Sequence, residues 1–317
     1  MAELKIPHVG GEGAVISARR LSLWYGKVIG INDLTIDIGP GVLGLLGPNG
    51  AGKSTFLKVV TGQLRPTTGN VGIFGELIWN NRNVMSRIGF VPEQDSFYEE
   101  MTGHQFVTYL TRLQGFSKKD AQELAAVAIQ TMSLSEKKDD KIRTYSKGMR
   151  QRIKIAQALA HNPDILFLDE PLAGTDPVGR RQIINLIRGF GEAGKTVIVS
   201  SHILHEVEQM TSSILLINKG RIVADGNIYK IRELIDEHPH SIRVGCENPR
   251  SFAAKLTAFD DVVSIHFSER GFEISTTDPD ACYRRIPKIA VESGIQLHRM
   301  SSLDNNLTAV FDYLVNA

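Results

Sequence analysis

Cysteine, net charge and long apolar runs are all scarce in this sequence of 317 residues. Its two cysteines, Cys246 and Cys282, are too few for a disulfide framework and lack metal-site spacing, which favours a reducing, cytoplasmic setting. The 36 Lys+Arg nearly cancel the 35 Asp+Glu, so the sequence lacks the basic excess typical of nucleic-acid binders. No apolar stretch approaches the roughly 20 residues of a membrane-spanning helix, and no signal peptide is visible at the N-terminus. We therefore expect a chain that neither crosses a membrane nor binds nucleic acid.

What is present is an ordinary globular composition, with 42% hydrophobic and 22% charged residues, enough for one large domain or two modest ones. Over the first part of the chain, short apolar runs alternate with stretches of helical periodicity. That alternation predicts an α/β core with a mostly parallel sheet. The expected strands are Val15–Ser17, Leu34–Ile38, Gly41–Leu46, Ile165–Leu168 and Val197–Ser200, and the expected helices follow Lys53, fill much of Thr102–Leu134, cover Gly148–Ala160 and Pro177–Phe190, and start at His202.

A polar, proline-containing stretch at Asp236–His240 indicates a linker, which divides the chain into residues 1–238 and 239–317. The second part has the order β-α-β-β-α-β, which predicts a small ferredoxin-like α+β domain. An amphipathic helix at Leu307–Val315 is expected to close it. The expected elements are strands at Ser241–Gly245, Val262–Phe267, from Gly271 and at Gln296–Met300, with helices at Pro249–Phe259 and Pro279–Ser293.

A glycine-rich segment between an apolar strand and a helix fits the phosphate-loop pattern G-x-x-x-x-G-K-[ST]. Glycines allow backbone N–H groups to approach phosphate oxygens, and the helix N-terminus adds its positive dipole end. Lys53 is suited to neutralise β- and γ-phosphate charge, and the Ser54 hydroxyl is suited to ligate Mg²⁺. The predicted nucleotide-contacting residues are Gly47, Pro48, Asn49, Gly50, Ala51, Gly52, Lys53, Ser54 and Thr55.

Two adjacent acids, Asp169 and Glu170, follow the apolar strand Ile165–Leu168. Successive strand residues point to opposite sides, so the two carboxylates are expected to have separate roles. Asp169 suits the Mg²⁺ shell, and Glu170 suits the group that orients or deprotonates an attacking water.

Together these motifs resemble the ATP-binding subunits of ABC transporters, over about residues 15–235. The segment Tyr145–Met149 stands where that family has its LSGGQ signature, although only Ser146 and Gly148 match it. The YSKGM variant resembles exporter-type subunits whose membrane domain is a separate chain. By the same resemblance, Asp176 lies in the D-loop, His202 is the switch histidine that contacts the γ-phosphate, and Tyr25 stacks on adenine.

The Q-loop is less regular, because the family's glutamine aligns with Glu93 and a glutamine, Gln94, follows it. Either the loop shifts by one residue or Glu93 serves as an acceptor only, so both remain candidates beside the metal. The apolar residues after it, Phe97, Tyr98 and Met101, suit either ordinary packing or docking of a membrane partner. Lys137, Lys138, Arg150 and Arg152 are expected on a solvated face.

The resemblance implies a P-loop ABC ATPase core with a helical subdomain at about residues 95–160, using ATP and Mg²⁺. It implies two subunits paired head to tail, each ATP lying between one phosphate loop and the opposite signature, with a separate permease at the cytoplasmic face of the membrane. The alternative is a soluble ABC-type ATPase of translation or DNA repair, disfavoured by the single core, the absence of a coiled-coil insertion and the near-neutral charge. Residues 239–317 are expected to regulate or dimerise the motor.

Overall fold

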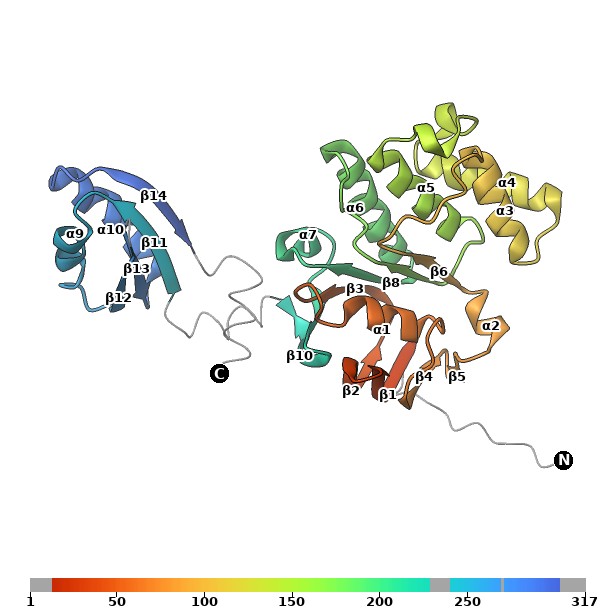
Figure 1. Ribbon diagram of the computed structural model, residues 1–317, viewed down its shortest axis with the longest axis horizontal. Coiled ribbons are helices and arrows are strands. Elements are labelled where there is room, and N and C mark those ends of the chain that lie inside the picture. Colours follow the sequence, from red (N-terminus) through yellow and green to blue (C-terminus); the bar gives the residue numbers. More distant parts are fainter. Residues whose placement is uncertain (1–12, 229–239, 269–270, 303–317) are drawn as a thin grey trace. The chain divides into compact units, whose positions relative to one another are not determined.

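The computed structural model describes residues 13–228, 240–268 and 271–302 (Figure 1). Contacts divide the chain into two compact units, residues 1–225 and 226–317, each considered by itself below. The domain boundary expected at residues 238 and 239 and the closing helix expected at Leu307–Val315 lie outside the described ranges.

The centre of the first unit is a six-stranded sheet with the order β10-β9-β3-β8-β7-β6. Strands β3, β8, β7 and β6 pair in parallel, and β3 also pairs in parallel with β9. Strand β7 is buried at every position, as expected for a parallel strand covered on both faces. The strands are β3 Gly41–Leu46, β6 Ile88–Val91, β7 Ile165–Leu168, β8 Thr196–Ser201, β9 Ser213–Asn218 and β10 Arg221–Asn227.

A second, antiparallel sheet with the order β2-β1-β4-β5 lies on the other side of helix α1, Lys53–Val60 (Figure 1). Phe56, Leu57 and Val60 of α1 are buried in one apolar core with side chains from both sheets. The helix that carries the phosphate loop is thereby fixed between two sheets. The strands are β1 Ile16–Tyr25, β2 Val28–Ile38, β4 Thr68–Ile73 and β5 Glu76–Leu77.

Helices α3, Gly103–Leu113, and α4, Lys118–Thr131, pack on each other and on α5, Lys147–Leu159. Each begins at a side-chain cap: the Thr102 hydroxyl accepts from the Gln105 amide in a capping box, and Ser117 accepts from Asp120. These helices lie on the far side of the six-stranded sheet from α1, together with α6, Pro177–Glu192 (Figure 1). Helix α7 is short, Leu204–Glu208, and starts two residues after His202 rather than at it.

The second unit has the strand order β12-β13-β11-β14 with antiparallel pairing throughout. This is the arrangement of two split β-α-β units, so the ferredoxin-like prediction is confirmed. Both cysteines are buried in its core, where Phe252 and Phe272 pack edge to face. Its elements are β11 His240–Cys246, α9 Pro249–Leu256, β12 Val262–Ser268, β13 Gly271–Thr276, α10 Pro279–Glu292 and β14 Leu297–Ser302.

Candidate functional site

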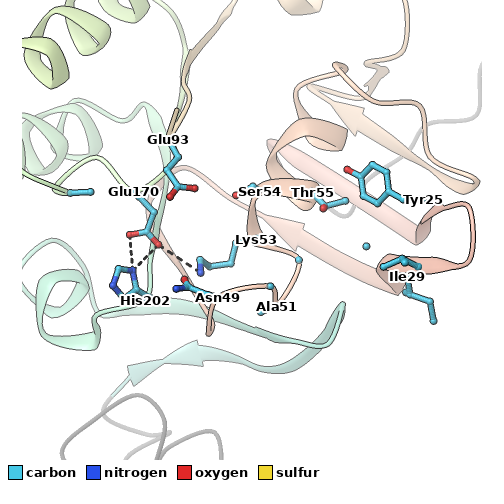
Figure 2. A pocket seen from close by; sticks show the side chains of 15 residues that line it. Tyr25, Ile29, Asn49, Ala51, Lys53, Ser54, Thr55, Glu93, Glu170 and His202 are labelled. Atoms are coloured by element: carbon cyan, nitrogen blue, oxygen red, sulfur yellow. Dashed lines mark hydrogen bonds and ion pairs between the residues drawn. The ribbon is translucent and has the colours of Figure 1, made fainter. Parts of the chain in front are cut away.

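A cavity of about 540 Å³ opens over the phosphate loop (Figure 2). It draws residues from the antiparallel sheet and from one edge of the parallel sheet, where the phosphate loop, the segment after β6 and the segments after β7 and β8 lie. That edge is where the carboxyl ends of parallel strands meet, the usual ligand position in open α/β folds. The lining residues are Tyr25, Val28, Ile29, Gly30, Asn49, Gly50, Ala51, Gly52, Lys53, Ser54, Thr55, Glu93, Glu170, Ala173 and His202.

The loop itself depends on glycine at two kinds of position. Gly50 and Gly52 have φ of 79° and 108°, in the left-handed region. A Cβ on Gly47 would collide with the carbonyl oxygen of Ile217, and one on Gly52 with that of Gly30. Helix α1 begins at Lys53 without a side-chain cap, so its first amide groups remain available to an anion.

Lys53 is almost fully buried and its ammonium group already has acceptors within the protein. Its Nζ donates to the carbonyl oxygens of Gly47 at 2.7 Å and Pro48 at 3.3 Å. It also lies 3.7 Å from Oε1 of Glu170, across the cavity (Figure 2). The cation is thus held at the place where phosphate oxygens would compete for it.

The two carboxylates after β7 have different surroundings, as the sequence predicts. Asp169 accepts a hydrogen bond from Ser200 Oγ at 2.6 Å, while Ser200 Oγ accepts from the Glu170 amide at 2.9 Å. The two side chains point in different directions because of a turn, and the strand alternation expected from sequence is not the cause. Strand β7 already ends at Leu168, and Glu170 has a φ of 49°. Such a left-handed residue costs on the order of 1–3 kcal/mol. The turn directs Glu170 into the cavity (Figure 2), while Asp169 is buried and does not line it.

His202 completes the group around Glu170. Its Nδ1 lies 3.1 and 3.0 Å from the two oxygens of that carboxylate. Burial raises the pKa of Glu170, while the hydrogen bond and charge of His202 and the charge of Lys53 act in the opposite direction. Glu170 is therefore a carboxylate more basic than an exposed glutamate, which suits a group that accepts a proton.

The remaining cavity residues expected from sequence are placed as follows. Tyr25 stands at the mouth, 48% exposed, beside Ile29, where an aromatic face is available to a planar base (Figure 2). Glu93 lines the cavity and Gln94 does not. Ser54 and Thr55 line it from the start of α1. In the described parts of the chain, no three His, Cys, Asp or Glu side chains converge as a metal-binding group.

The signature and D-loop residues lie together but outside this cavity. Ser146 caps α5 by accepting from the Met149 amide at 3.2 Å, and Asp176 caps α6 by accepting from Gly179 at 2.8 Å. That last hydrogen bond is the main cause that lowers the pKa of Asp176. A Cβ on Gly148 would be 3.2 Å from the Asp176 carboxylate, so the two motifs are in close contact.

Several polar residues of this unit were not anticipated. Two of them gave no motif in the sequence. Ser200 joins the Asp169 carboxylate to the Glu170 backbone amide, and Lys154 holds the segment after β6. Arg150 was expected on a solvated face, but its side chain is only 20% exposed. Its guanidinium makes two hydrogen bonds, of 2.6 and 2.8 Å, to Glu99 and lies over the ring of Phe97.

A phosphate loop on a central strand of a parallel sheet, facing a buried glutamate, defines a nucleotide-binding protein of the P-loop class. The family model described as "ABC transporter" matches residues 31–173. An uncharacterized ABC transporter ATP-binding protein of Synechocystis is 37% identical over 253 residues, covering 78% of this chain and 71% of that protein. The daunorubicin/doxorubicin resistance ATP-binding protein of Streptomyces peucetius is 33% identical over 264 residues, 83% of this chain and 78% of that one. The chain belongs to the family of ABC transporter ATP-binding proteins.

Two further comparisons agree. The bacitracin transport ATP-binding protein of Bacillus licheniformis is 28% identical over 313 residues, 95% of this chain and 97% of that protein. Among solved structures, an ATP-binding subunit of an ABC transporter is 25% identical, with a TM-score of 0.64, covering 70% of this chain and 93% of its own. The protein is thus an ATP-hydrolysing subunit of the ABC transporter type, and a role in translation or DNA repair is not favoured. No helix in the described ranges has the length and apolar character to span a membrane.

Proposed function

We propose that this chain binds MgATP between its own phosphate loop and the signature of a second copy, and that hydrolysis drives a separate membrane permease. The observation that carries the proposal is the composition of the cavity. The phosphate loop, Glu170 and His202 line it, whereas Ser146 and Gly148 start helix α5 elsewhere. A signature so placed is available to a nucleotide held by another subunit, with a hydroxyl and helix-start amides as donors.

The metal would be held by Ser54 at the start of α1 and by Asp169, with Glu93 or Gln94 beside it. The donor set fits, because hydroxyl and carboxylate oxygens are what Mg²⁺ prefers and Ser54 and Glu93 line the cavity. Bound there, Mg²⁺ would neutralise charge on the β- and γ-phosphates.

In the reaction, Lys53 exchanges its carbonyl acceptors in the loop for phosphate oxygens. Glu170 orients the attacking water and accepts its proton, and its raised pKa makes it a better base. His202 holds the Glu170 carboxylate through Nδ1 and contacts the γ-phosphate. Asp176, beside Gly148 of its own chain, links the two sites of the pair.

The test is the variant Glu170→Gln, which retains the shape of the side chain without its basicity. We expect ATP binding to persist, turnover to fall by about 10²–10⁴-fold, and an ATP-dependent dimer to accumulate. Calorimetry, phosphate release and light scattering measure the three properties, with the exposed Glu136→Gln as control. A variant that hydrolyses ATP at the wild-type rate, or stays monomeric with ATP, contradicts the proposal.

The permease partner would dock beside the helical region, at the cytoplasmic face of the membrane. Tyr98, 54% exposed, and Tyr109, 39% exposed, make an edge-to-face pair there, a surface that suits an apolar partner helix. The relatives named for drug resistance and bacitracin transport support an export direction. Recovery of a polytopic protein with the wild type but not with Tyr98→Glu, at unchanged ATPase activity, supports this surface. Equal recovery with both excludes it.

Residues 239–317 would form an accessory domain that regulates or dimerises the motor. Its complete ferredoxin-like sheet and separate core support an independent module. Removal of this region should alter dimerisation or ATPase activity, and unchanged values for both would make it a passive appendage.

A further inference from the structure

Strand β6 is the last strand of the parallel sheet, and its backbone carbonyls face two ways. The carbonyl oxygen of Val91 points to β7, where it accepts from the Asp169 amide at 2.9 Å. The alternate carbonyls of Ile88, Phe90 and Pro92 point to the other side, as strand geometry requires. An edge strand leaves such acceptors without backbone partners, so they need another source of donors.

Side chains of helix α5 and of the turn that follows it supply these donors. His161 Nε2 is 3.0 Å from the carbonyl of Ile88, and Gln157 Nε2 donates to that of Phe90 at 3.0 Å. Lys154 Nζ donates to the next one, Pro92, at 3.2 Å. Lys154 and Gln157 are three residues apart and hence on one face of the helix, and His161 follows in the turn after it. The set forms a stripe that meets every second carbonyl along β6 and just beyond its end.

Two further features of the sequence permit this contact. A Cβ on Gly89 would collide with the carbonyl oxygen of Ala158, so glycine permits the close approach. Burial lowers the pKa of His161, which favours the neutral imidazole. Since a carbonyl only accepts, the neutral ring donates through Nε2.

Lys154 extends the stripe beyond the strand into the segment that enters the nucleotide cavity. Its side chain is 5% exposed, and Nζ also donates to the carbonyl of Glu93 at 3.0 Å and pairs with Asp95 at 2.8 Å. A buried ammonium is costly unless every proton has an acceptor, and here three acceptors are present. One turn earlier, Arg150 holds Glu99 of the same segment.

We propose that Lys154 is a positioning residue of the ATPase site. It fixes the backbone at Pro92 and Glu93 and thereby keeps the Glu93 side chain at the cavity wall. Without this anchor the loop would lose the ordering that now precedes nucleotide binding. Ser146 caps the N-terminus of the same helix. A movement of α5 would therefore move Lys154 and, through its hydrogen bond, the backbone of Glu93. The inference rests on the role proposed above for Glu93 at the nucleotide.

A double-mutant cycle tests whether Lys154 acts through Glu93. Lys154→Met removes the donors but retains the length of the apolar stem. We expect it to lower kcat about tenfold with little change in KM for ATP, as for a displaced catalytic group. In a Glu93→Ala background the same substitution should have no further effect, since the group it positions is gone. Additive losses, or an unchanged kcat in the single variant, overturn the proposal.

Hydrogen exchange gives a readout that does not require hydrolysis. In Lys154→Met the amides of residues 93–97 should exchange at least tenfold faster, while those of α1 remain unchanged. The exposed Lys119→Met on α4 is the matched control. Unchanged exchange at residues 93–97 in Lys154→Met would refute the proposed anchoring by Lys154. A wild-type protein without ATPase activity would instead refute the proposed function and leave the anchoring untouched. If Lys154→Met does not fold, Lys154→Gln, which retains an amide donor, takes its place, with a smaller rise in exchange expected.

Discussion

The imidazole Nδ1 of His202 lies within 3.1 Å of both carboxylate oxygens of Glu170, 32 residues earlier in the chain. The contact joins the ends of two neighbouring parallel strands and places a titratable ring against the proposed base. It makes the basicity of Glu170 dependent on His202, since the hydrogen bond and charge of the ring lower a pKa that burial raises.

The first prediction concerns the pH dependence of turnover. Because burial raises the pKa of Glu170, the acid limb of the kcat profile should lie above the ordinary glutamate value of 4.5. Below that pKa the carboxyl is protonated and accepts no proton from water. His202→Ala removes an influence that lowers this pKa, so its acid limb should move to higher pH. A limb that stays in place or moves to lower pH, measured at saturating ATP, contradicts the coupling.

The second prediction concerns stability. An acid whose pKa is raised in the folded state destabilises the fold at pH values above that pKa, and the penalty disappears below its unfolded value. Glu170→Gln replaces the buried charge with a neutral amide. The variant should therefore be more stable than the wild type at neutral pH, and the difference should shrink as the pH falls. Urea unfolding at several pH values measures it, and a variant less stable at neutral pH counts against a net burial penalty.

Lys53 provides the third prediction. Its ammonium group is the cation held within the loop, 2.7 Å from the Gly47 carbonyl. Lys53→Ala should abolish measurable ATP binding in calorimetry, because the loop amides alone then face the triphosphate charge. Lys58, exposed on the same helix, is the matched control, and Lys58→Ala should bind normally. Equal affinity of the Lys53 variant and the wild type would exclude the loop as the phosphate site.

The fourth prediction separates base stacking from phosphate binding. Tyr25→Ala should weaken ATP binding about two- to tenfold, the range expected for loss of one aromatic stacking partner. Tyr25→Phe, which retains an aromatic ring, should bind ATP as the wild type does. Inorganic triphosphate, which has no base, should bind both variants as it binds wild type. Trp24 is similarly exposed but does not line the cavity, so Trp24→Ala should leave ATP affinity unchanged. If Tyr25→Ala weakened the binding of ATP and of triphosphate equally, Tyr25 would contact the phosphates instead of the base.

The fifth prediction decides between two neighbours that sequence alone left open. Glu93 lines the cavity and Gln94 does not, so Glu93→Ala should reduce kcat about tenfold and Gln94→Ala should not. The opposite ranking would mean that the loop shifts by one residue when nucleotide binds.

The parts of the fold that follow from local chemistry were predictable. Strand β3 has the bounds expected from its apolar run, and so does β7, because a strand buried on both faces has a continuous apolar sequence. No helix or strand was predicted between residues 66 and 91, although β4, β5, β6 and the short helix α2, Arg82–Met85, lie there. Strand β4 is exposed at its first three positions and buried at its last three, so it lacks the alternation that identifies a half-buried strand.

At the site, too, residues whose role follows from local sequence were predicted, and residues that act through distant contacts were not. Residues 47–55 form one contiguous segment, and the spacing of their residue types was enough to predict a phosphate-binding loop. Ser200 contacts a backbone amide and a carboxylate 30 and 31 residues away, and Lys154 contacts carbonyls more than 60 residues away. A lysine on an amphipathic helix has the pattern of a solvated residue, and only the tertiary contact shows that it is buried.

The stripe of side chains from α5 and the turn after it has a second consequence, for solubility. A bare edge strand presents a template on which another chain can add a strand and begin to aggregate. Here the carbonyls of Ile88, Phe90 and Pro92 are already occupied by His161, Gln157 and Lys154. The helix that carries the signature also closes the sheet against growth, so a substitution in this stripe risks insoluble protein as well as slower hydrolysis.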